Sequence, residues 1–577
     1  MGAIQEKLPF LSLIKNYKKA FLTGDLSAGF ATGVLLIPQG MAYAVIAGVP
    51  VEYGLYASLM APLLYFFFGS SNKLVIGPAA LDSMLLASGM AGIGIALTET
   101  AYVEHVLIIV FLAGIFQFIA GNIKLGFIAN FFSEPLLKGF TTAAALLIGF
   151  SQFKHVLGID HESSNYFHKN IINMINNWDQ FDLLTFGLGT STILMILLLK
   201  RFDLSKISTP IVVVIGITLS IVFNLEEFGI SVIGTIPKGL PSFQLLDFSS
   251  VNLLEIIPVA LVVAIIGFTV SNSISKSVDE PGSKTNPNQE FIALGIANAV
   301  GALFGGYQAS SSFSRTAINS ESGANTRASN LVSTVMIALV LLFMTHVFYY
   351  LPKAVLGGII IAATPSLFSF NYFKNIYFLK KREFVVVIIT FLTTIEFGVI
   401  IGLTAGLSAS VAVFMYHSLY PHMAVLGKIE GTHIHRNILR FESAKEKDGV
   451  LILRIDAPLY FSNIKFVIDT IKELVDERNN ITSIIIKSES INYIDVTALT
   501  ELKLFIGKAN KKGIEVYMVT VVGPVRDLLF KTSIVDTLGG KQLFVHLYDV
   551  MQYIDDKESY RYTNKDIANQ GNIEERD

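Results

Sequence analysis

The sequence predicts an α-helical polytopic membrane protein that ends in a small soluble α/β domain. Three observations carry this expectation: charge is scarce, long apolar runs recur, and the pattern changes near Gly449. Hydrophobic residues make up 52% of the 577 residues and charged residues 15%, whereas a soluble chain carries roughly 25% charged residues. The mean hydropathy of +0.58 also indicates a chain that lies largely in lipid.

Apolar runs recur between Asp25 and Pro421, the expected transmembrane domain (25–421). A helix needs about 20 apolar residues to cross the roughly 30 Å hydrocarbon layer. About fourteen runs are candidate spans: 25–46, 51–69, 79–95, 103–121, 135–156, 183–199, 209–225, 251–275, 289–306, 315–323, 329–350, 353–370, 383–398 and 399–418. The runs 79–95 and 315–323 are too short to cross alone.

Basic residues orient these spans. The segment 1–24 is rich in lysine and has no cleavable signal sequence, so it is expected to stay in the cytoplasm. The outer loops then keep few basic residues, namely Lys154, Lys169, Lys238 and Lys353, as the positive-inside rule requires. An even number of spans places the C-terminal domain in the cytoplasm too, below an inner membrane of the bacterial type.

The pattern after Gly449 is that of a soluble domain. The stretches "GVLILRIDAPLYF", "ITSIIIKSESI" and "GIEVYMVTV" read as short buried strands, and amphipathic helices are expected between them. Strands that alternate with helices predict an α/β domain at 449–555. The segment 422–448 is expected to hold a linker and the domain's first strand, and the polar tail 556–577 to be disordered.

Two helix starts point to an anion site. Gly77-Pro78 precedes a short apolar helix, and "ASSSFSRT" at 309–316 offers a second start with a charged Arg315. A helix that begins inside the membrane leaves N–H groups without partners, and its positive dipole end favours an anion. Discontinuous helices at matching positions of two repeats mark the binding site of a transporter.

Arg315 has two interpretations. An arginine inside the membrane costs at least about 2.5–3.5 kcal/mol, so it persists only where it is paired or functional. It either binds the anion or forms a structural ion pair, for instance with Glu290 or Glu321. Gln39 and Tyr43, four residues apart on one helix face, either meet the same cavity or pack around a kink at Pro38.

Several segments resemble the sulfate permease (SulP) family of anion transporters. They are "PQGMAYAVIAGVPVEYGLY" (38–56), "IGPAA" (76–80), "SEPLLKGFTTAAALLIGFSQFKHVLG" (133–158), "NPNQEFIALGIANAVGALFGGYQASSSFSRT" (286–316) and "SGANTRAS" (322–329). The resemblance implies fourteen spans in a seven-plus-seven inverted repeat, a core domain that moves against a gate domain, and a homodimer. It places Ser314 and Arg315 at the anion site. The expected substrate-binding set is Gln39, Tyr43, Gly77, Pro78, Ala79, Ala80, Ser314, Arg315 and Thr316.

The chain departs from that family's pattern at three positions. Ala79 stands where many relatives have an aromatic residue, and Val270 where many have a carboxylate. Asp82 lies in the short third span, where relatives usually have an apolar residue. We hypothesise that Asp82 replaces the missing acid and binds H⁺ or Na⁺ as coupling ion, or pairs with Arg315. The alternative is a helix-start aspartate that the helix dipole stabilises.

The C-terminal domain resembles the STAS domain of sulfate transporters and anti-sigma factor antagonists, through "YIDVTAL" (493–499) and "APLYFSN" (457–463). Asp495 and Thr497 are both candidates for the N-cap of the following helix. In soluble relatives a hydroxyl near this place is phosphorylated, and Thr497 is the nearest match, so Thr497 is a regulatory candidate with capping as its alternative. A cytoplasmic protein partner of this domain is a further expectation.

The sequence carries no P-loop, metal-ligand spacing, nucleophile elbow or nucleic-acid motif, and it has no cysteine. We therefore expect no enzyme activity, no cofactor and no metal. The expected function is secondary active transport of a small inorganic anion, by resemblance sulfate, coupled to H⁺ or Na⁺. Bicarbonate or a dicarboxylate as substrate, an uncoupled anion channel or exchanger, and a sensor with a membrane anchor remain alternatives.

Overall fold

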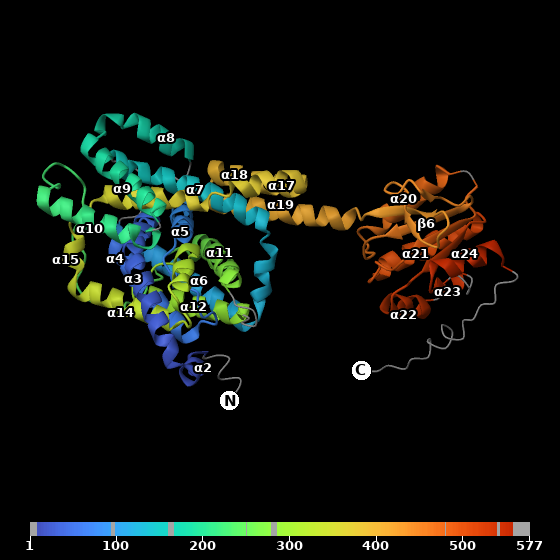
Figure 1. Cartoon of the computed structure of the whole chain (residues 1–577), viewed down its shortest axis with the longest axis horizontal. Coiled ribbons are helices and arrows are strands. Elements are labelled where there is room, and N and C mark those ends of the chain that lie inside the picture. The colour runs from blue at the N-terminus through green and yellow to red at the C-terminus, as the bar shows by residue number, and fades with distance from the viewer. Residues whose placement is uncertain are drawn as a thin grey trace. The chain divides into compact units, whose positions relative to one another are not determined.

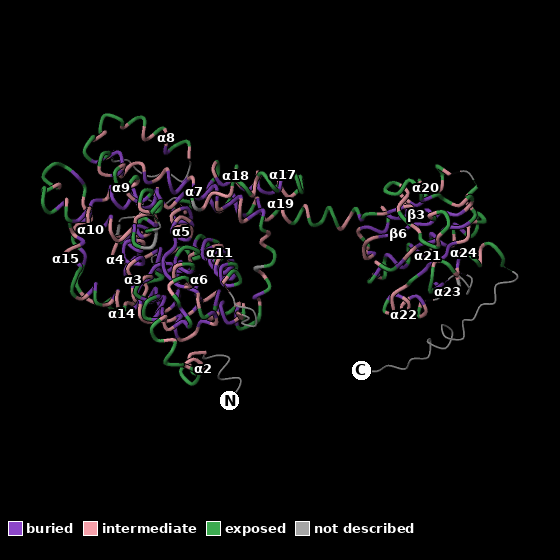
Figure 2. The backbone as a smooth tube through the Cα atoms, viewed as in Figure 1, coloured by how far each residue is buried: buried purple, intermediate pink, exposed green. Residues whose placement is uncertain are grey.

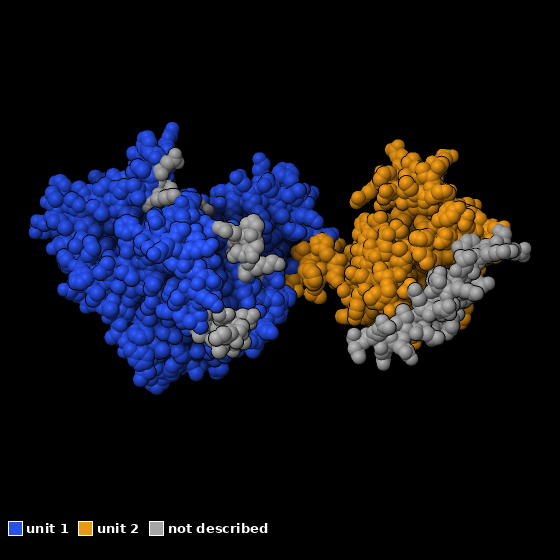
Figure 3. Space-filling view, turned by 60° about the horizontal axis from the view of Figure 1, so that its bottom comes forward, with its two compact units in different colours: residues 1–410 blue, residues 411–577 orange. Residues whose placement is uncertain are grey.

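The structure is a computed structural model of the chain, and it describes residues 9–93, 99–159, 167–202, 204–249, 251–278, 285–478, 480–532, 534–538 and 543–557. It divides into two compact units, residues 1–410 and 411–577 (Figure 3). The expected disordered tail lies, from residue 558 onward, outside the described residues, as do the first eight residues of the N-terminal segment.

The first unit is almost entirely helical (Figure 1). Its helices are α2 (Pro9–Asn16), α3 (Lys19–Ala47), α4 (Val51–Phe68), α5 (Ala80–Ile93), α6 (Glu99–Asn122), α7 (Glu134–Leu157), α8 (Phe167–Asn176), α9 (Leu183–Arg201), α10 (Ser205–Phe223), α11 (Leu253–Val278), α12 (Pro287–Ala302), α13 (Phe313–Glu321), α14 (Ala328–Phe343), α15 (Thr345–Phe348), α16 (Lys353–Ala363), α17 (Phe370–Leu379), α18 (Lys381–Phe397) and α19 (Val399–Leu419, which continues into the second unit). Short 3₁₀ helices lie at Leu125–Phe131, Trp178–Gln180 and Thr364–Leu367.

Every apolar run singled out in the sequence overlaps one of these helices. Among the described helices, seven are both long and apolar enough to cross a membrane, and shorter apolar helices accompany them. The chain is thus a polytopic membrane protein, as the sequence predicted. The amphipathic α8 was not expected, and its residues are exposed or intermediate apart from the buried Asn170 (green and pink in Figure 2), whereas about half of the residues of α5 are buried.

Helices α6 and α12 pack through their backbones. A Cβ atom at Gly295 of α12 would lie 2.5 Å from the Phe118 backbone nitrogen of α6. A Cβ atom at Gly114 of α6 would lie 2.3 Å from the Ala299 backbone nitrogen of α12. Because backbone atoms cannot move aside as a flexible side chain does, only glycine fits at these two positions.

The second unit has a seven-stranded sheet with helices around it. Its strands are β3 (Met423–Ile429), β4 (His435–Asn437), β5 (Ala444–Lys445), β6 (Val450–Ile455), β7 (Ser483–Lys487), β8 (Glu515–Val519) and β9 (Leu543–Phe544), and its helices after α19 are α20 (Ile464–Asp476), α21 (Val496–Lys511), α22 (Gly523–Lys531), α23 (Ile534–Thr537) and α24 (Leu547–Asp555). The strand order is β4-β3-β6-β7-β8-β9, with β5 also paired to β3. Strands β6 to β9 run parallel, and β3 is antiparallel to β6. The three strands expected in this region are confirmed.

Alternating residues of the central strands serve two cores. In β6, Leu451 and Leu453 lie in a core with residues of α20, α21 and α22, while Val450 and Ile452 lie in a core with residues of α24. Successive side chains of a strand point to opposite faces, so nearly continuous apolar strands mean that both faces are covered. The sheet is therefore covered on both sides, as an α/β domain requires.

We expect Gly295→Val to destabilise the first unit by about 3 kcal/mol or more, because the new side chain would meet the backbone of α6. Thermal unfolding of the purified protein in detergent, followed by circular dichroism, measures this effect. The matched control is Gly187→Val on α9, where a Cβ atom meets nothing within 4 Å. Equal unfolding midpoints for the two variants would contradict the close contact of α6 and α12.

Candidate functional site

Two short strands join the starts of the broken helices. Strand β1 (Ile76–Gly77) pairs antiparallel with β2 (Ser310–Ser311), with Ile76 opposite Ser311 and Gly77 opposite Ser310. Helix α5 begins three residues after β1, and α13 begins two residues after β2. An apolar interior does not tolerate unpaired backbone groups, and this two-residue ladder pairs them where the helices are interrupted. The two helix starts expected from the sequence are therefore neighbours.

Arg315 is the largest fully buried side chain of the described residues. Its Nη1 atom donates to Gln39 Oε1 of α3 at 3.2 Å, and its Nη2 atom donates to the Gly77 carbonyl oxygen at 3.3 Å. Its Nε atom is buried without a partner. The guanidinium group, which stays charged in proteins, thus connects α3, β1 and α13 and leaves its Nε donor unused.

The other expected site residues differ in their exposure. Gln39 and Tyr43 of α3 are half-buried, and the charge of Arg315 acts on Tyr43. Pro38 lies inside the continuous α3. At the start of α5, Gly77, Pro78 and Ala79 are buried and Ala80 is half-buried.

The start of α13 has one exposed and one bonded hydroxyl. Ser314 is exposed, and its Oγ atom lies 3.1 Å from that of Ser312. Thr316 is buried, and its hydroxyl oxygen accepts the Val75 backbone N–H at 3.3 Å. Thr316 therefore ties α13 to the segment before α5, while the Ser314 hydroxyl is exposed beside that of Ser312.

In the described part of the chain, the hydrogen-bond partners of Arg315 are uncharged, and the ion pairs considered for it are not formed. Glu290 of α12 is fully buried and bonds elsewhere, to the Tyr65 hydroxyl, to the Ser70 N–H and hydroxyl, and to the Ser71 N–H. The hydrogen-bond partners of Arg315 are Gln39 and Gly77, and it forms no ion pair with Glu290 or Glu321. An uncharged acceptor set leaves its positive charge available.

Asp82 lies in the first turn of α5 and is buried. Its Oδ2 atom accepts a hydrogen bond from the Ser310 hydroxyl, and its Oδ1 atom has no partner. The charge of Arg315 acts on Asp82 through space, but within the described chain no ion pair joins the two. Direct pairing of Asp82 with Arg315 is thus not formed in the described chain, whereas the place of Asp82 in the first turn agrees with stabilisation by the helix dipole.

Buried amide side chains lie beside Asp82, and the sequence did not predict this arrangement. Gln117 of α6 donates to the Ala264 carbonyl at 2.9 Å and accepts from Asn298 of α12 at 3.0 Å. Gln308, just before β2, is fully buried, and neither of its amide atoms has a partner. The available signal was a lone Gln or Asn inside an apolar run, which by itself does not say what it faces.

In the second unit, Asp495 and not Thr497 caps α21. Asp495 is the N-cap residue: its Oδ1 atom accepts the Ala498 N–H at 2.7 Å, and its Oδ2 atom accepts the Phe461 N–H at 2.7 Å. Thr497 lies one residue inside the helix and is exposed. The expectation of a capping role is confirmed for Asp495 and wrong for Thr497.

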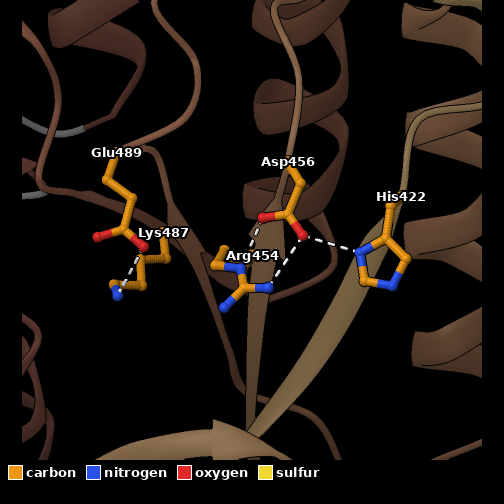
Figure 4. Close-up of polar contacts among 5 residues, drawn as sticks. All are labelled: His422, Arg454, Asp456, Lys487 and Glu489. Carbon is orange, nitrogen blue, oxygen red and sulfur yellow. Dashed lines mark hydrogen bonds and ion pairs between the residues drawn. The ribbon is translucent and has the colours of Figure 1, made fainter.

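A charged cluster lies at the end of β6 in the same unit (Figure 4). Arg454 donates to both oxygens of Asp456, at 2.6 and 2.9 Å, and His422 Nδ1 lies 2.8 Å from Asp456 Oδ2. Lys487, opposite Arg454 in the parallel pair, bonds Glu489 at 2.9 Å. Partial burial alone would raise the pKa of Asp456, but the bonds from Arg454 and His422 outweigh it and hold this pKa below its usual range.

No group of three or more His, Asp or Glu residues in the described parts of the chain could hold a metal ion.

Two family models and several known proteins match this chain. Residues 22–390 match the family model described as the sulfate permease family, and residues 443–550 match that of the STAS domain. The chain is 33% identical to the probable sulfate transporter 4.2 of Arabidopsis thaliana over 565 residues, 94% of this chain and 83% of that protein. It is 32% identical to prestin of Rattus norvegicus over 486 residues, 79% of this chain and 65% of that protein.

Solved structures share the fold. A structure of SLC26A9 superposes with a TM-score of 0.87 at 21% identity and covers 96% of this chain and 94% of its own. The transmembrane domain of a cyanobacterium bicarbonate transporter, BicA, superposes with a TM-score of 0.58 at 21% identity over 68% of this chain and 98% of its own. At these identities the likeness concerns the fold alone.

The low pKa of Asp456 predicts how acid affects the second unit. A carboxyl whose folded-state pKa is depressed adds stability above its unfolded pKa of about 3.9 and loses it as the pH falls through the folded value. We therefore expect Asp456→Asn to weaken the unit by about 1 kcal/mol at most between pH 7 and 5, since the ion pair is partly exposed. The difference from the unsubstituted protein should close only below about pH 4.

Hydrogen exchange of the β6 amides in the full-length protein measures this difference across the pH range. The control is Asp527→Asn, an exposed aspartate on α22, which should change little at any pH. A difference for Asp456→Asn that is already lost at pH 6 would contradict the assigned direction.

Proposed function

The chain belongs to the sulfate permease family, whose members move anions across membranes, and from this membership we propose that it is a secondary active transporter of sulfate. In this proposal the anion binds between α5 and α13 and crosses by alternating access, as the core domain moves against the gate domain. The energy comes from a gradient of H⁺ or Na⁺. No catalysis is assigned to the chain.

The observation that supports the proposal is the buried, unpaired charge of Arg315. Its guanidinium group is held by two uncharged oxygens, and its Nε donor is unused. Burying a charge without a counter-ion in direct contact is unfavourable, and a bound anion would supply that contact. The N-terminal ends of α5 and α13 flank the same place, and their dipoles favour negative charge as well.

Gln39, Tyr43 and Ser314 are the proposed remaining contacts. Gln39 and Tyr43 are half-buried and Ser314 is exposed, so a ligand beside Arg315 can reach them. Gly77 to Ala80 and Thr316 belong to the site through the backbone of the two helix starts. Amide and hydroxyl groups can donate hydrogen bonds to an oxyanion.

Sulfate is proposed as the substrate because the similar proteins of Arabidopsis thaliana are named sulfate transporters. Bicarbonate is the alternative, since the fold also occurs in a bicarbonate transporter. We further propose a homodimer in an inner membrane of the bacterial type, with the N-terminus and the STAS domain in the cytoplasm. In that position Thr497 is exposed to modification and the domain can meet a protein partner.

Arg315→Gln should raise the KM for sulfate about 10- to 100-fold. The variant loses charge-assisted hydrogen bonds worth about 1.5–3 kcal/mol. Arg315→Lys keeps the charge but not the forked geometry, so its KM should lie in between. The measurement is uptake of labelled sulfate, bicarbonate and fumarate into proteoliposomes under imposed H⁺ and Na⁺ gradients.

The matched control is Arg327→Gln, which removes another buried arginine of the same unit. Arg327 donates to the Phe66 carbonyl oxygen at 3.1 Å and lies outside the proposed site. This change should lower the yield of folded protein but leave the KM near that of the unsubstituted protein. Absence of flux for all three anions would refute the proposed function, and a steady anion current without H⁺ or Na⁺ flux would identify a channel instead.

A further inference from the structure

Asp82 and Gln308 are buried side chains whose free polar atoms converge on one point. A Cβ atom at Gly267 of α11 would lie 3.0 Å from Gln308 Nε2 and 3.5 Å from Asp82 Oδ1. Both atoms lack a hydrogen-bond partner, as does Gln308 Oε1. A buried carboxylate oxygen and a buried amide without partners are costly to leave unsatisfied. A ligand or a shared proton between them would satisfy both groups.

The surroundings hold these two groups in place but offer them no competing partner. Gln117 approaches the same point, with its Nε2 atom 3.8 Å from the Gly267 Cβ position, but it already bonds Ala264 and Asn298. Asn298 in turn accepts the Ala309 N–H at 2.8 Å. Fixed on both sides, Gln117 cannot turn toward Asp82, whereas no hydrogen bond of the described residues fixes the orientation of the Gln308 amide.

Resting on the proposed transport function, we propose that Asp82 carries the coupling proton and that Gln308 is the positioning residue that serves both of its charge states. When Asp82 is ionised, the Gln308 Nε2–H group donates to Oδ1. When Asp82 is protonated on Oδ1, the amide turns and Gln308 Oε1 accepts that proton's hydrogen bond. The Ser310 hydroxyl holds Oδ2 in both states.

A proton suits this place better than a metal cation. Hard cations take about six oxygen ligands, and the two free side chains offer one carboxylate oxygen and one amide oxygen. Even a Cβ atom would be crowded at Gly267, whereas a proton needs no space. The site is therefore assigned to H⁺.

Protonation of Asp82 changes the charge that an anion meets at Arg315. The charges of the two groups act on one another, and the other titratable groups coupled to them are Tyr307, before β2, and Tyr43 on α3. Toward Asp82, α11 presents Gly267 and α6 presents Gln117. With Asp82 ionised, its negative charge offsets Arg315, and with Asp82 neutral the positive charge attracts the anion in full.

The proton site at Asp82 and the anion site at Arg315 are also connected through the β1–β2 ladder. Asp82 is bonded to Ser310, Ser310 lies opposite Gly77, and the Gly77 carbonyl accepts from Arg315. Anion binding and proton binding must then favour each other equally, because coupling free energy is reciprocal. The inferred consequence is that the proton and the anion travel in the same direction.

The test is sulfate transport by the full-length protein in proteoliposomes between pH 5.5 and 8, with simultaneous measurement of proton uptake. The KM of the unsubstituted protein should rise with pH, by up to about tenfold per unit for one linked proton. Asp82→Asn should give a KM that does not depend on pH, sulfate exchange without proton uptake, and no accumulation driven by a pH gradient. Gln308→Leu should keep proton uptake but move the KM profile to higher pH, since the ionised carboxylate loses its donor.

The control for a buried aspartate is Asp25→Asn. Asp25 accepts from the Asn325 and Thr326 backbone N–H groups and from the Thr326 and Tyr17 hydroxyls, so both of its oxygens are occupied. This variant should keep its proton coupling. Gly267→Ala, whose methyl group would separate Asp82 from Gln308, gives a second test if Asp82→Asn fails to fold, and it should shift the pH profile as Gln308→Leu does.

Accumulation of sulfate by Asp82→Asn under a pH gradient, with the KM still dependent on pH, would overturn the inference while leaving sulfate transport intact. Uptake that follows an Na⁺ gradient in the unsubstituted protein and is lost in Asp82→Asn would assign the site to Na⁺ and overturn the proton. Absence of any anion flux in the unsubstituted protein is the distinct result that refutes the transport function itself.

Discussion

Helices that stop in the interior of an apolar unit expose backbone N–H and C=O groups that water cannot reach, and the first unit depends on how these groups are satisfied. The ladder of β1 and β2 pairs some of them with one another. Thr316 and Arg315 satisfy others, namely the Val75 N–H and the Gly77 carbonyl. The N–H groups that begin α5 and α13 are left directed at the place where a negatively charged ligand compensates them. The same interruption that is costly for the fold is what creates an anion site.

The opposite charges of Arg315 and Asp82 act on one another without direct contact. Arg315 and Asp82 are each bonded to neutral groups, so neither charge is quenched by direct pairing. A tight ion pair would remove the electrostatic attraction for a substrate and fix the protonation of the acid. Separation through Ser310 and Gly77 keeps both groups responsive, and this makes a buried carboxylate compatible with transport.

The sequence predicted the parts of this architecture that depend on local pattern. Apolar runs located the membrane helices, and the change after Gly449 located the strands of the second unit, because burial on both faces makes strands such as Val450–Ile455 continuously apolar. Gly77-Pro78 and Arg315 pointed to the two helix starts. The sequence did not predict the amphipathic α8, because this helix is too polar for a membrane span and lies outside the apolar runs.

The sequence could not predict which side chains from distant segments contact one another. Gln117, Gly267 and Gln308 are far apart in the chain and meet only through the packing of α6, α11 and β2. An aspartate in the first turn of α5 has the same local sequence whether it pairs with Arg315 or with Ser310. For the same reason, Asp495 and Thr497 were equal candidates for the cap until the backbone showed which side chain reaches the free N–H groups.

The contact between Gly114 and Gly295 sets the register of the buried amide side chains beside Asp82. Gln117 and Asn298 each lie three residues beyond one of these glycines, nearly one helical turn away, and they bond one another at 3.0 Å. A slip of one residue between α6 and α12 would rotate that amide pair out of line, and two interlocked backbones resist such a slip. The absence of two side chains therefore fixes the alignment of α6 and α12, and with it the height at which the Gln117 and Asn298 amides lie near Asp82.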